Sequence, residues 1–358
     1  MAKKALIAMS GGVDSSAAAL LMKEKGYDCV GVTMRLFDND DVGERNDRPC
    51  CSLDDAEDAG RVARSLGIPF YIFDFAPDFR REVIDRFADA YARGLTPNPC
   101  IDCNRYIKYE RLFKRAEALG FDILVTGHYA RTDRDEESGR FLLRKAADKA
   151  KDQTYFLYAL TQEQLARAAY PLGDLTKTKV RAIAEAHGFA NARKRDSQDI
   201  CFVRNGAYGD FIEAYTGKRY PDGDFVDFDG RILGRHNGVI RYTVGQRKGL
   251  GKAWGSPMYV TAIRPETNEI VLGGNDALFR SELIARDINI ISSESLPDPK
   301  RVFAKIRSSK EAAPATVVQT DDDELKIVFD EPQRAVTGGQ AAVLYDGDIV
   351  VGGGTIAN

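Results

Sequence analysis

The sequence predicts an α/β parallel-sheet domain, followed by a small central β domain and a C-terminal β-barrel. Strand-like and helix-like segments alternate over about the first 130 residues, which is typical of a parallel sheet covered on both faces. Beyond about residue 205 the chain becomes rich in glycine, with short β-like runs. From about residue 280 a further series of such runs predicts a second β module.

The strands of the first domain are predicted from apolar segments rich in β-branched and aromatic residues. These segments cover residues 4–9, 29–37, 69–75 and 122–128. Helical periodicity predicts helices over residues 14–25, 53–66, 78–93, 104–119, 161–170 and 176–187.

The change in composition and residue pattern along the chain predicts three domains. We place the parallel-sheet domain at 1–205, the central β-rich domain at 206–278 and the barrel at 279–358. In the last domain "VFAKIRSS", "ATVVQT" and "ELKIVFD" are typical barrel strands, and residues 292–301 are a predicted loop. A barrel of about six strands fits this length.

The composition predicts a cytoplasmic protein without a membrane partner. Of the 358 residues, 44% are hydrophobic and 29% charged, as in ordinary globular proteins. No apolar run approaches the ~18 residues that span a bilayer, and the N-terminal run is too short for a signal peptide. The net charge of −3 argues against indiscriminate coating of nucleic acid. Basic stretches that leave room for local contacts occur at 104–115, 144–151, 192–196 and 245–252.

The segment "ALIAMSGGVDSSAAALL" predicts a phosphate site. A strand, a turn with two glycines and a helix bring backbone N–H groups and the helix N-terminus to an anion. Serine hydroxyls add donors. The Walker pattern G-x-x-x-x-G-K-[ST] and the dinucleotide pattern G-x-G-x-x-G are both absent.

Six cysteines in a cytoplasmic chain are expected to be reduced, so they are catalytic, metal-binding or packed. Cys100 and Cys103 form a C-x-x-C at a predicted helix start, where Asn104 and the first N–H groups are expected to lower a thiol pKa. Cys201 lies far along the chain in "DSQDICF". For Cys50 and Cys51 a structural role is favoured over a sulfur relay.

Seven motifs together resemble the tRNA-specific 2-thiouridylases of the MnmA type. These enzymes belong to the PP-loop ATP pyrophosphatases, whose fold is adenine nucleotide alpha-hydrolase-like. The motifs, in chain order, are "AMSGGVDSS", "TPNPCIDCNRYIK", "TGHYAR", "KDQTYFL", "LGDLTKTKVR", "DSQDICF" and "YTVGQRKGLG".

The resemblance implies the following site residues. ATP would be held by Ala8, Met9, Ser10, Gly11, Gly12, Val13, Asp14, Ser15, Ser16, Met34 and Gly127. The tRNA would be contacted by Asn98, Pro99, Cys100, Lys151, Asp152, Gln153, Arg307 and Ser308. Cys103 would be the nucleophile, Cys201 the carrier of persulfide sulfur, and Asp14 a group that positions Mg²⁺. His128, at the end of a predicted strand, is a further candidate contact of ATP.

The implied reaction is ATP-dependent 2-thiolation of the wobble uridine in the anticodon stem-loop of tRNAs for Lys, Glu and Gln. ATP would adenylate the C2 oxygen, and AMP and pyrophosphate would be released. The sulfur would come from a cysteine desulfurase or a sulfur-relay protein.

One position departs from the family. Many members have aspartate where this chain has Cys100, so Cys100, Cys103 and Cys201 are candidate ligands of a [4Fe-4S] cluster or, less favoured, of zinc. A persulfide and a cluster therefore compete as the sulfur carrier. Two other functions stay open: another PP-loop ligase (amidating or argininosuccinate-type), or a non-catalytic protein that binds tRNA in an ATP-dependent way.

Overall fold

The first domain is built on a five-stranded sheet in the order β3-β2-β1-β4-β7, with every neighbouring pair parallel. The computed structural model describes residues 2–37, 53–194, 199–203, 207–251 and 254–357. The central strand is buried on both faces, and Ala5, Leu6 and Ile7 have no exposed surface. The strands are β1 (Lys4–Ala8), β2 (Asp28–Arg35), β3 (Phe70–Asp74), β4 (Ile123–Val125) and β7 (Ala168–Ala169).

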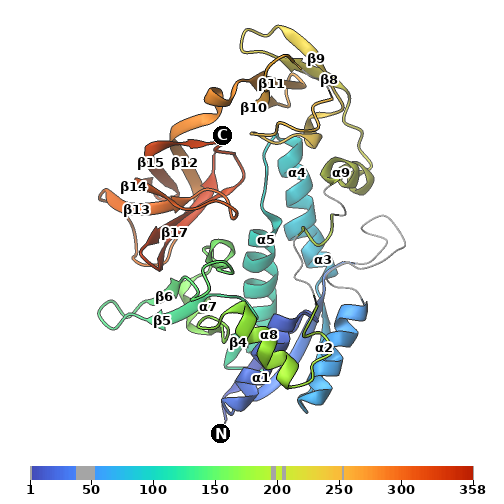
Figure 1. The fold of residues 1–358 in the computed structure, drawn as a ribbon. Coiled ribbons are helices and arrows are strands. Elements are labelled where there is room, and N and C mark those ends of the chain that lie inside the picture. The colour runs from blue at the N-terminus through green and yellow to red at the C-terminus, as the bar shows by residue number, and fades with distance from the viewer. Residues whose placement is uncertain (1, 38–52, 195–198, 204–206, 252–253, 358) are drawn as a thin grey trace.

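Helices cover both faces of this sheet (Figure 1). On one face lie α1 (Val13–Glu24), α2 (Leu53–Ser65) and α8 (Lys177–Ala186), which share one hydrophobic core with β1. On the other lie two longer helices, each with a π-helical stretch in which N–H groups bond five residues back. The first comprises α3 (Ala76–Phe79), the π-helical stretch Arg80–Asp85 and α4 (Arg86–Ala92). The second comprises α5 (Pro99–Asp102), the π-helical stretch Cys103–Leu112 and α6 (Phe113–Ala118).

The helix predicted over 161–170 is wrong in its second half. Helix α7 (Gln162–Ala166) begins at a capping box between Thr161 and Gln164, as the sequence allows. Residues Ala168–Ala169 instead form strand β7, which pairs with Leu124 and Val125 of β4. Sheet pairing here overrides the high helix propensity of alanine.

The central domain contains one helix that the prediction of a purely β-rich stretch missed. Helix α9 (Tyr208–Thr216) ends at the left-handed residue Gly217. It is followed by a four-stranded sheet in the order β10-β11-β8-β9. These strands are β8 (Gly223–Val226), β9 (Ile232–His236), β10 (Tyr259–Arg264) and β11 (Glu269–Gly273).

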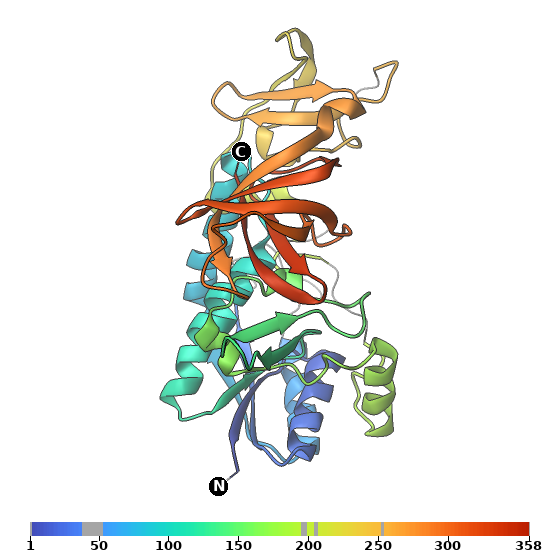
Figure 2. The same cartoon turned by 90° about the vertical axis from the view of Figure 1, so that its left-hand side faces the viewer.

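The C-terminal domain is a closed barrel of six strands, because β12 pairs with both β15 and β17. Its strands are β12 (Phe279–Ile290), β13 (Lys300–Lys305), β14 (Ala313–Asp321), β15 (Glu324–Arg334), β16 (Ala341–Asp346) and β17 (Ile349–Ile356). A hairpin of the first domain, β5 (Arg131–Arg134) and β6 (Phe141–Arg144), extends this sheet by pairing with one end of β17, at Ile349. Figure 2 shows this hairpin directly below the barrel.

The barrel forms hydrogen bonds with the backbone of the first-domain segment that precedes Cys100. The Thr96 N–H donates to the Gly338 carbonyl (2.9 Å), and Gln340 Nε2 donates to the Thr96 carbonyl (2.8 Å). Nearby, the Tyr155 hydroxyl donates to the Ala341 carbonyl (3.0 Å). The first domain and the outer face of β16 therefore share one hydrophobic core. Within the described ranges, we find no helix with the length and hydrophobicity to cross a bilayer.

Candidate active site

A glycine turn joins β1 to α1 and is held by its own serines. The Ser15 hydroxyl accepts from the Ser10 N–H (3.1 Å) and donates to the Gly12 carbonyl (3.0 Å). Gly11 has φ +72°, and a β-carbon there would clash with the backbone carbonyl of Asp55. At the end of β4, a β-carbon on Gly127 would lie 2.7 Å from the Ser15 nitrogen. Both glycines are therefore required for the close approach of these segments.

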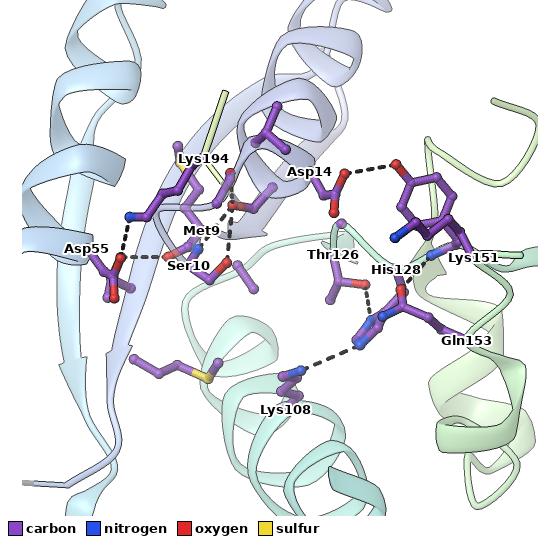
Figure 3. Close-up of a pocket in the computed structure, with 18 of the residues that line it drawn as sticks. Met9, Ser10, Asp14, Asp55, Lys108, Thr126, His128, Lys151, Gln153 and Lys194 are labelled. Carbon is purple, nitrogen blue, oxygen red and sulfur yellow. Dashed lines mark hydrogen bonds and ion pairs between the residues drawn. The ribbon is translucent and has the colours of Figure 1, made fainter. Parts of the chain in front are cut away.

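This turn forms one wall of a cavity of about 530 Å³ at the carboxyl ends of β1, β2 and β4 (Figure 3). The α1 N-terminus supplies unpaired N–H groups and partial positive charge there, which suits a phosphate. Of the predicted ATP contacts, nine line the cavity: Ala8, Met9, Ser10, Gly12, Val13, Asp14, Ser15, Met34 and Gly127. Gly11 packs against Asp55 instead, and Ser16 is buried beneath the turn, where it accepts from Asn191 (2.9 Å).

Three residues predicted to contact tRNA also line this cavity, namely Lys151, Asp152 and Gln153. Two of them have backbone partners that fix the segment. Gln153 Oε1 accepts from the Tyr129 N–H (3.0 Å), and Asp152 accepts from the Ala146 N–H (3.0 Å). The structure thus places them with the predicted ATP contacts, which the sequence did not indicate.

Asp14, the predicted metal-positioning residue, is engaged at both carboxylate oxygens. The Tyr129 hydroxyl donates to one oxygen (2.8 Å), and Lys177 Nζ forms an ion pair with the other (2.7 Å). The charge of Asp14 is therefore balanced by Lys177.

Two lysines that sequence reasoning did not single out also line the cavity. Lys108 comes from the π-helical stretch Cys103–Leu112, and Lys194 follows α8. Lys194 forms ion pairs with Asp55 and with Asp58 (2.8 Å). Both lysines belong to basic stretches visible in the sequence, 104–115 and 192–196, but no pattern there told which side chain points inward. The lining of the cavity thus carries three lysines, Lys108, Lys151 and Lys194, together with three aspartates, Asp14, Asp55 and Asp152.

His128 lines the cavity and is buried. Its Nδ1 lies 2.8 Å from the Thr126 hydroxyl, and its Nε2 lies 3.5 Å from Lys108 Nζ. Burial lowers the pKa of His128 well below its usual value, and the neighbouring Lys108 lowers it further. The imidazole is therefore neutral at pH 7.

Cys103 lies where α5 passes into the π-helical stretch, and it is partly exposed. The expected lowering of its thiol pKa is wrong as a net effect, because burial raises the pKa of Cys103. Lys108 opposes this rise and Asp102 adds to it. Asn104 does not face the thiol, because its amide donates to the Phe156 carbonyl (3.2 Å) and accepts from Lys108 (2.9 Å).

The three candidate cluster ligands differ in setting. Cys100 is exposed, with its N–H donating to the cap residue Asn98 (3.2 Å), and Pro99 beside it is buried. Cys201 is partly exposed beside Phe202, whose ring packs against Phe87. Across the described ranges, no three His, Cys, Asp or Glu side chains are grouped so that they could hold a metal ion. The expected gathering of Cys100, Cys103 and Cys201 around a metal is therefore not observed. Cys50 and Cys51 lie outside the described residues.

The predicted tRNA contacts in the barrel have contrasting roles in the structure. Arg307 donates to the Val244 carbonyl (3.1 Å), to the Ala335 carbonyl (3.2 Å) and to the Thr337 hydroxyl (2.6 Å). It thereby ties the barrel to the central domain. Ser308 is exposed.

Three families match successive parts of the chain. Residues 3–205 match the family described as "tRNA methyl transferase HUP domain". Residues 209–274 match "tRNA methyl transferase PRC-barrel domain", and residues 280–356 match "Aminomethyltransferase beta-barrel domain".

Curated relatives match the chain over its whole length. The chain is 53% identical to the tRNA-specific 2-thiouridylase MnmA of Clostridioides difficile, over 99% of this chain and 98% of that protein. It is 52% identical to the protein of the same name from Lachnoclostridium phytofermentans, over 99% of both chains. Identity to the one from Acetivibrio thermocellus is 50%, again over 99% of both.

Proposed function

Since the chain belongs to the family of the tRNA-specific 2-thiouridylases, we propose that it replaces the C2 oxygen of a wobble uridine in tRNA by sulfur, with ATP as the activating substrate. The substrates would be tRNAs for Lys, Glu and Gln, bound through the anticodon stem-loop. The sulfur would come from a cysteine desulfurase or a relay protein. The relatives' names support thiolation, whereas the family description mentions methyl transfer. A cavity suited to phosphates, lined by a residue of the helical stretch that carries Cys103, fits thiolation better.

One observation carries the proposal. The cavity beside the glycine turn is also lined by Lys108, which belongs to the same helical stretch as Cys103. An anion-binding site and a thiol therefore share one short piece of helix. That arrangement suits a reaction in which a phosphate-activated carbon is attacked by sulfur.

In the first step, the C2 oxygen of the uridine attacks the α-phosphorus of ATP, and pyrophosphate leaves. The turn at Ser10–Gly12 and the α1 N-terminus would hold the phosphates. To enter such a cavity the base must leave the anticodon stack. Mg²⁺ typically takes one or two carboxylates plus substrate phosphates, and Asp14 is the carboxylate at this turn; holding the ion there would require Asp14 to exchange its ion pair with Lys177 for the metal. When bound, Mg²⁺ would neutralise phosphate charge.

In the second step, the terminal sulfur of a Cys201 persulfide attacks C2, the C2–O bond breaks, and AMP leaves with the electron pair. The Cys103 thiolate then attacks the inner sulfur of Cys201. The sulfur–sulfur bond breaks, the outer sulfur stays on C2, and a Cys103–Cys201 disulfide forms. A thiol reductant reopens this disulfide. We propose this persulfide route because the described residues do not fit a [4Fe-4S] cluster.

The first test is a reconstitution. The full chain, purified anaerobically, is incubated with ATP, Mg²⁺, unmodified tRNA-Glu, a persulfide donor and a thiol reductant. Digested tRNA is then analysed by mass spectrometry, which distinguishes thiolated from methylated uridine. We expect 2-thiouridine from the wild type and none from Cys103→Ser or Cys201→Ser. The control is Cys29→Ala, which removes a buried thiol of β2 and leaves the cavity intact.

Other outcomes would favour the alternatives. AMP release without thiolation, unaffected by either cysteine variant, would indicate an amidating or argininosuccinate-type ligase. Binding of tRNA without AMP release would indicate a non-catalytic tRNA-binding protein. Thiolation that strictly requires bound iron would reinstate the cluster.

A further inference from the structure

Lys108 differs from Lys177 and Lys194 in having no acidic partner among the residues that the structure describes. Lys177 pairs with Asp14, and Lys194 pairs with Asp55 and Asp58. Lys108, by contrast, contacts the neutral Asn104 amide (2.9 Å) and lies 3.5 Å from the neutral His128. A partly buried ammonium without a counter-ion favours an anion arriving from outside.

The π-helical winding places this ammonium on the side of the helix that carries Cys103. Cys103 and Lys108 are five residues apart in the stretch Cys103–Leu112. In an α-helix, such a pair would be separated by roughly 140° around the axis. Hydrogen bonds from residue i+5 to residue i widen the helix and instead bring the two positions to the same side of it. Lys108 can therefore act on Cys103 and on the cavity at once.

We infer that Lys108 is the cation shared by the two halves of the site, stabilising the Cys103 thiolate and the negative charge on AMP as it leaves. The second part of this inference, stabilisation of the departing AMP, rests on the proposed function. The C2–O bond breaks towards the phosphate, and the electron pair that AMP carries away is neutralised at Lys108 Nζ. The ammonium keeps its proton throughout, so no further reactant is required.

The thiolate half can be tested without tRNA or sulfur. The alkylation rate of Cys103 by iodoacetamide is followed by peptide mass spectrometry over a series of pH values. For Lys108→Met we expect a higher midpoint and, near neutral pH, a rate lower by about tenfold, which corresponds to about one pKa unit. Lys108→Arg keeps the charge, and its rate should stay within about threefold of wild type.

The matched control is Lys114→Met. Lys114 lies on α6 of the same continuous helix, is exposed, and pairs with Glu110 (3.2 Å). In the Lys114→Met variant, Cys103 should be alkylated at the wild-type rate. Asp102 is the other charged group that acts on Cys103, with an effect opposite to that of Lys108. Asp102→Asn should therefore lower the midpoint. A Lys108→Met profile that matches the wild type, in protein with an unchanged thermal midpoint, would overturn the inference.

A second measurement does not depend on folding of the variant. In the wild type, a non-hydrolysable ATP analogue should compete for Lys108 and raise the pH midpoint of Cys103 alkylation. An unchanged midpoint at saturating analogue would contradict a shared cation.

The leaving-group half is tested by single-turnover release of AMP with bound tRNA. We expect a loss of about a hundredfold for Lys108→Met, near that of removing one preorganised charge stabiliser, and near-wild-type release for Lys114→Met. Equal AMP release by the Lys108→Met and Lys114→Met variants would overturn the proposed role of Lys108 in stabilising the leaving AMP. A wild type that never thiolates would instead overturn the proposed function, and the alkylation result would stand separately.

Discussion

At the scale of single residues, the site depends on how closely backbone segments approach each other. Gly11 has both a left-handed conformation and no room for a side chain, because the Asp55 carbonyl lies against it. Gly26, in the turn after α1, has φ +80°, but a β-carbon added there would meet nothing within 4 Å. A comparison of substitutions at the two glycines therefore distinguishes the cost of a strained backbone conformation from the cost of a steric clash.

We predict that Gly11→Ala lowers the free energy of unfolding by roughly 3 kcal/mol or more and abolishes ATP binding, because strain and clash add. Gly26→Ala should cost only about 1 kcal/mol and leave ATP binding intact. Denaturant unfolding and titration with ATP check both. Equal effects of the two substitutions would show that the contact with Asp55 does not matter.

The sequence could predict many of the cavity-lining residues at this scale but not their charge partners. The motif "SGGVDSS" predicts a turn whatever lies around it, since glycine and serine act locally. The pairing of Asp14 with Lys177 joins positions 163 residues apart, and no local pattern encodes it. The prediction for the thiol pKa at Cys103 is wrong for a related reason, because burial, which depends on the surrounding fold, raises the pKa of Cys103.

At the scale of elements, the turn between β15 and β16 holds the segment before the cysteines. Gln340 donates to the Thr96 carbonyl, and Gly339 has φ +87° where it packs against Thr96. Two residues further on, Asn98 caps α5, which leads to Cys103. Gln340 is therefore a positioning residue for the C-x-x-C segment.

We predict that Gln340→Ala loosens this segment at a cost of about 1 kcal/mol in unfolding free energy, typical of one hydrogen bond. Hydrogen exchange at the Thr96 amide, which bonds to Gly338, should become faster. Gln333→Ala removes a partly exposed glutamine on β15, whose amide donates to the Glu331 carbonyl, and serves as the control. Unchanged exchange at Thr96 in Gln340→Ala would contradict the positioning role.

Element prediction failed where short segments are defined by their neighbours. Ala168 and Ala169 are a strand only because β4 lies beside them. Helix α9 was missed because Tyr208, Phe211 and Tyr215 favour strands by residue type, although their spacing is helical. The buried strands of the first sheet were predicted well, since a central parallel strand is apolar along its whole length.

At the scale of the whole molecule, charge must be arranged locally if RNA is to bind. The chain carries 51 Lys and Arg against 54 Asp and Glu, so its net charge does not attract RNA. The order of the fold types along the chain, from the parallel sheet to the barrel, was predicted from changes in composition. The ties between domains, such as Arg307 to Val244, could not be predicted, because they join residues with no shared pattern.

We predict that tRNA affinity falls log-linearly with salt concentration, because phosphate contacts release counter-ions. Lys151→Ala should reduce this slope by about one if Lys151 contacts a tRNA phosphate. A lower ATP affinity with an unchanged slope would assign Lys151 to the nucleotide instead. Lys326→Ala, on the barrel and paired with Glu282, is the control and should change neither quantity.

The contact between Gln340 and Thr96 also bears on how the protein is made. The two residues are 244 positions apart, and a ribosome adds residues from the N-terminus. The parallel sheet and its glycine turn can be complete while the strand after Gln340 is still unsynthesised. The thiols of Cys100 and Cys103 thus acquire their final surroundings late in translation, so a nascent chain can hold a nucleotide before it is equipped to handle sulfur.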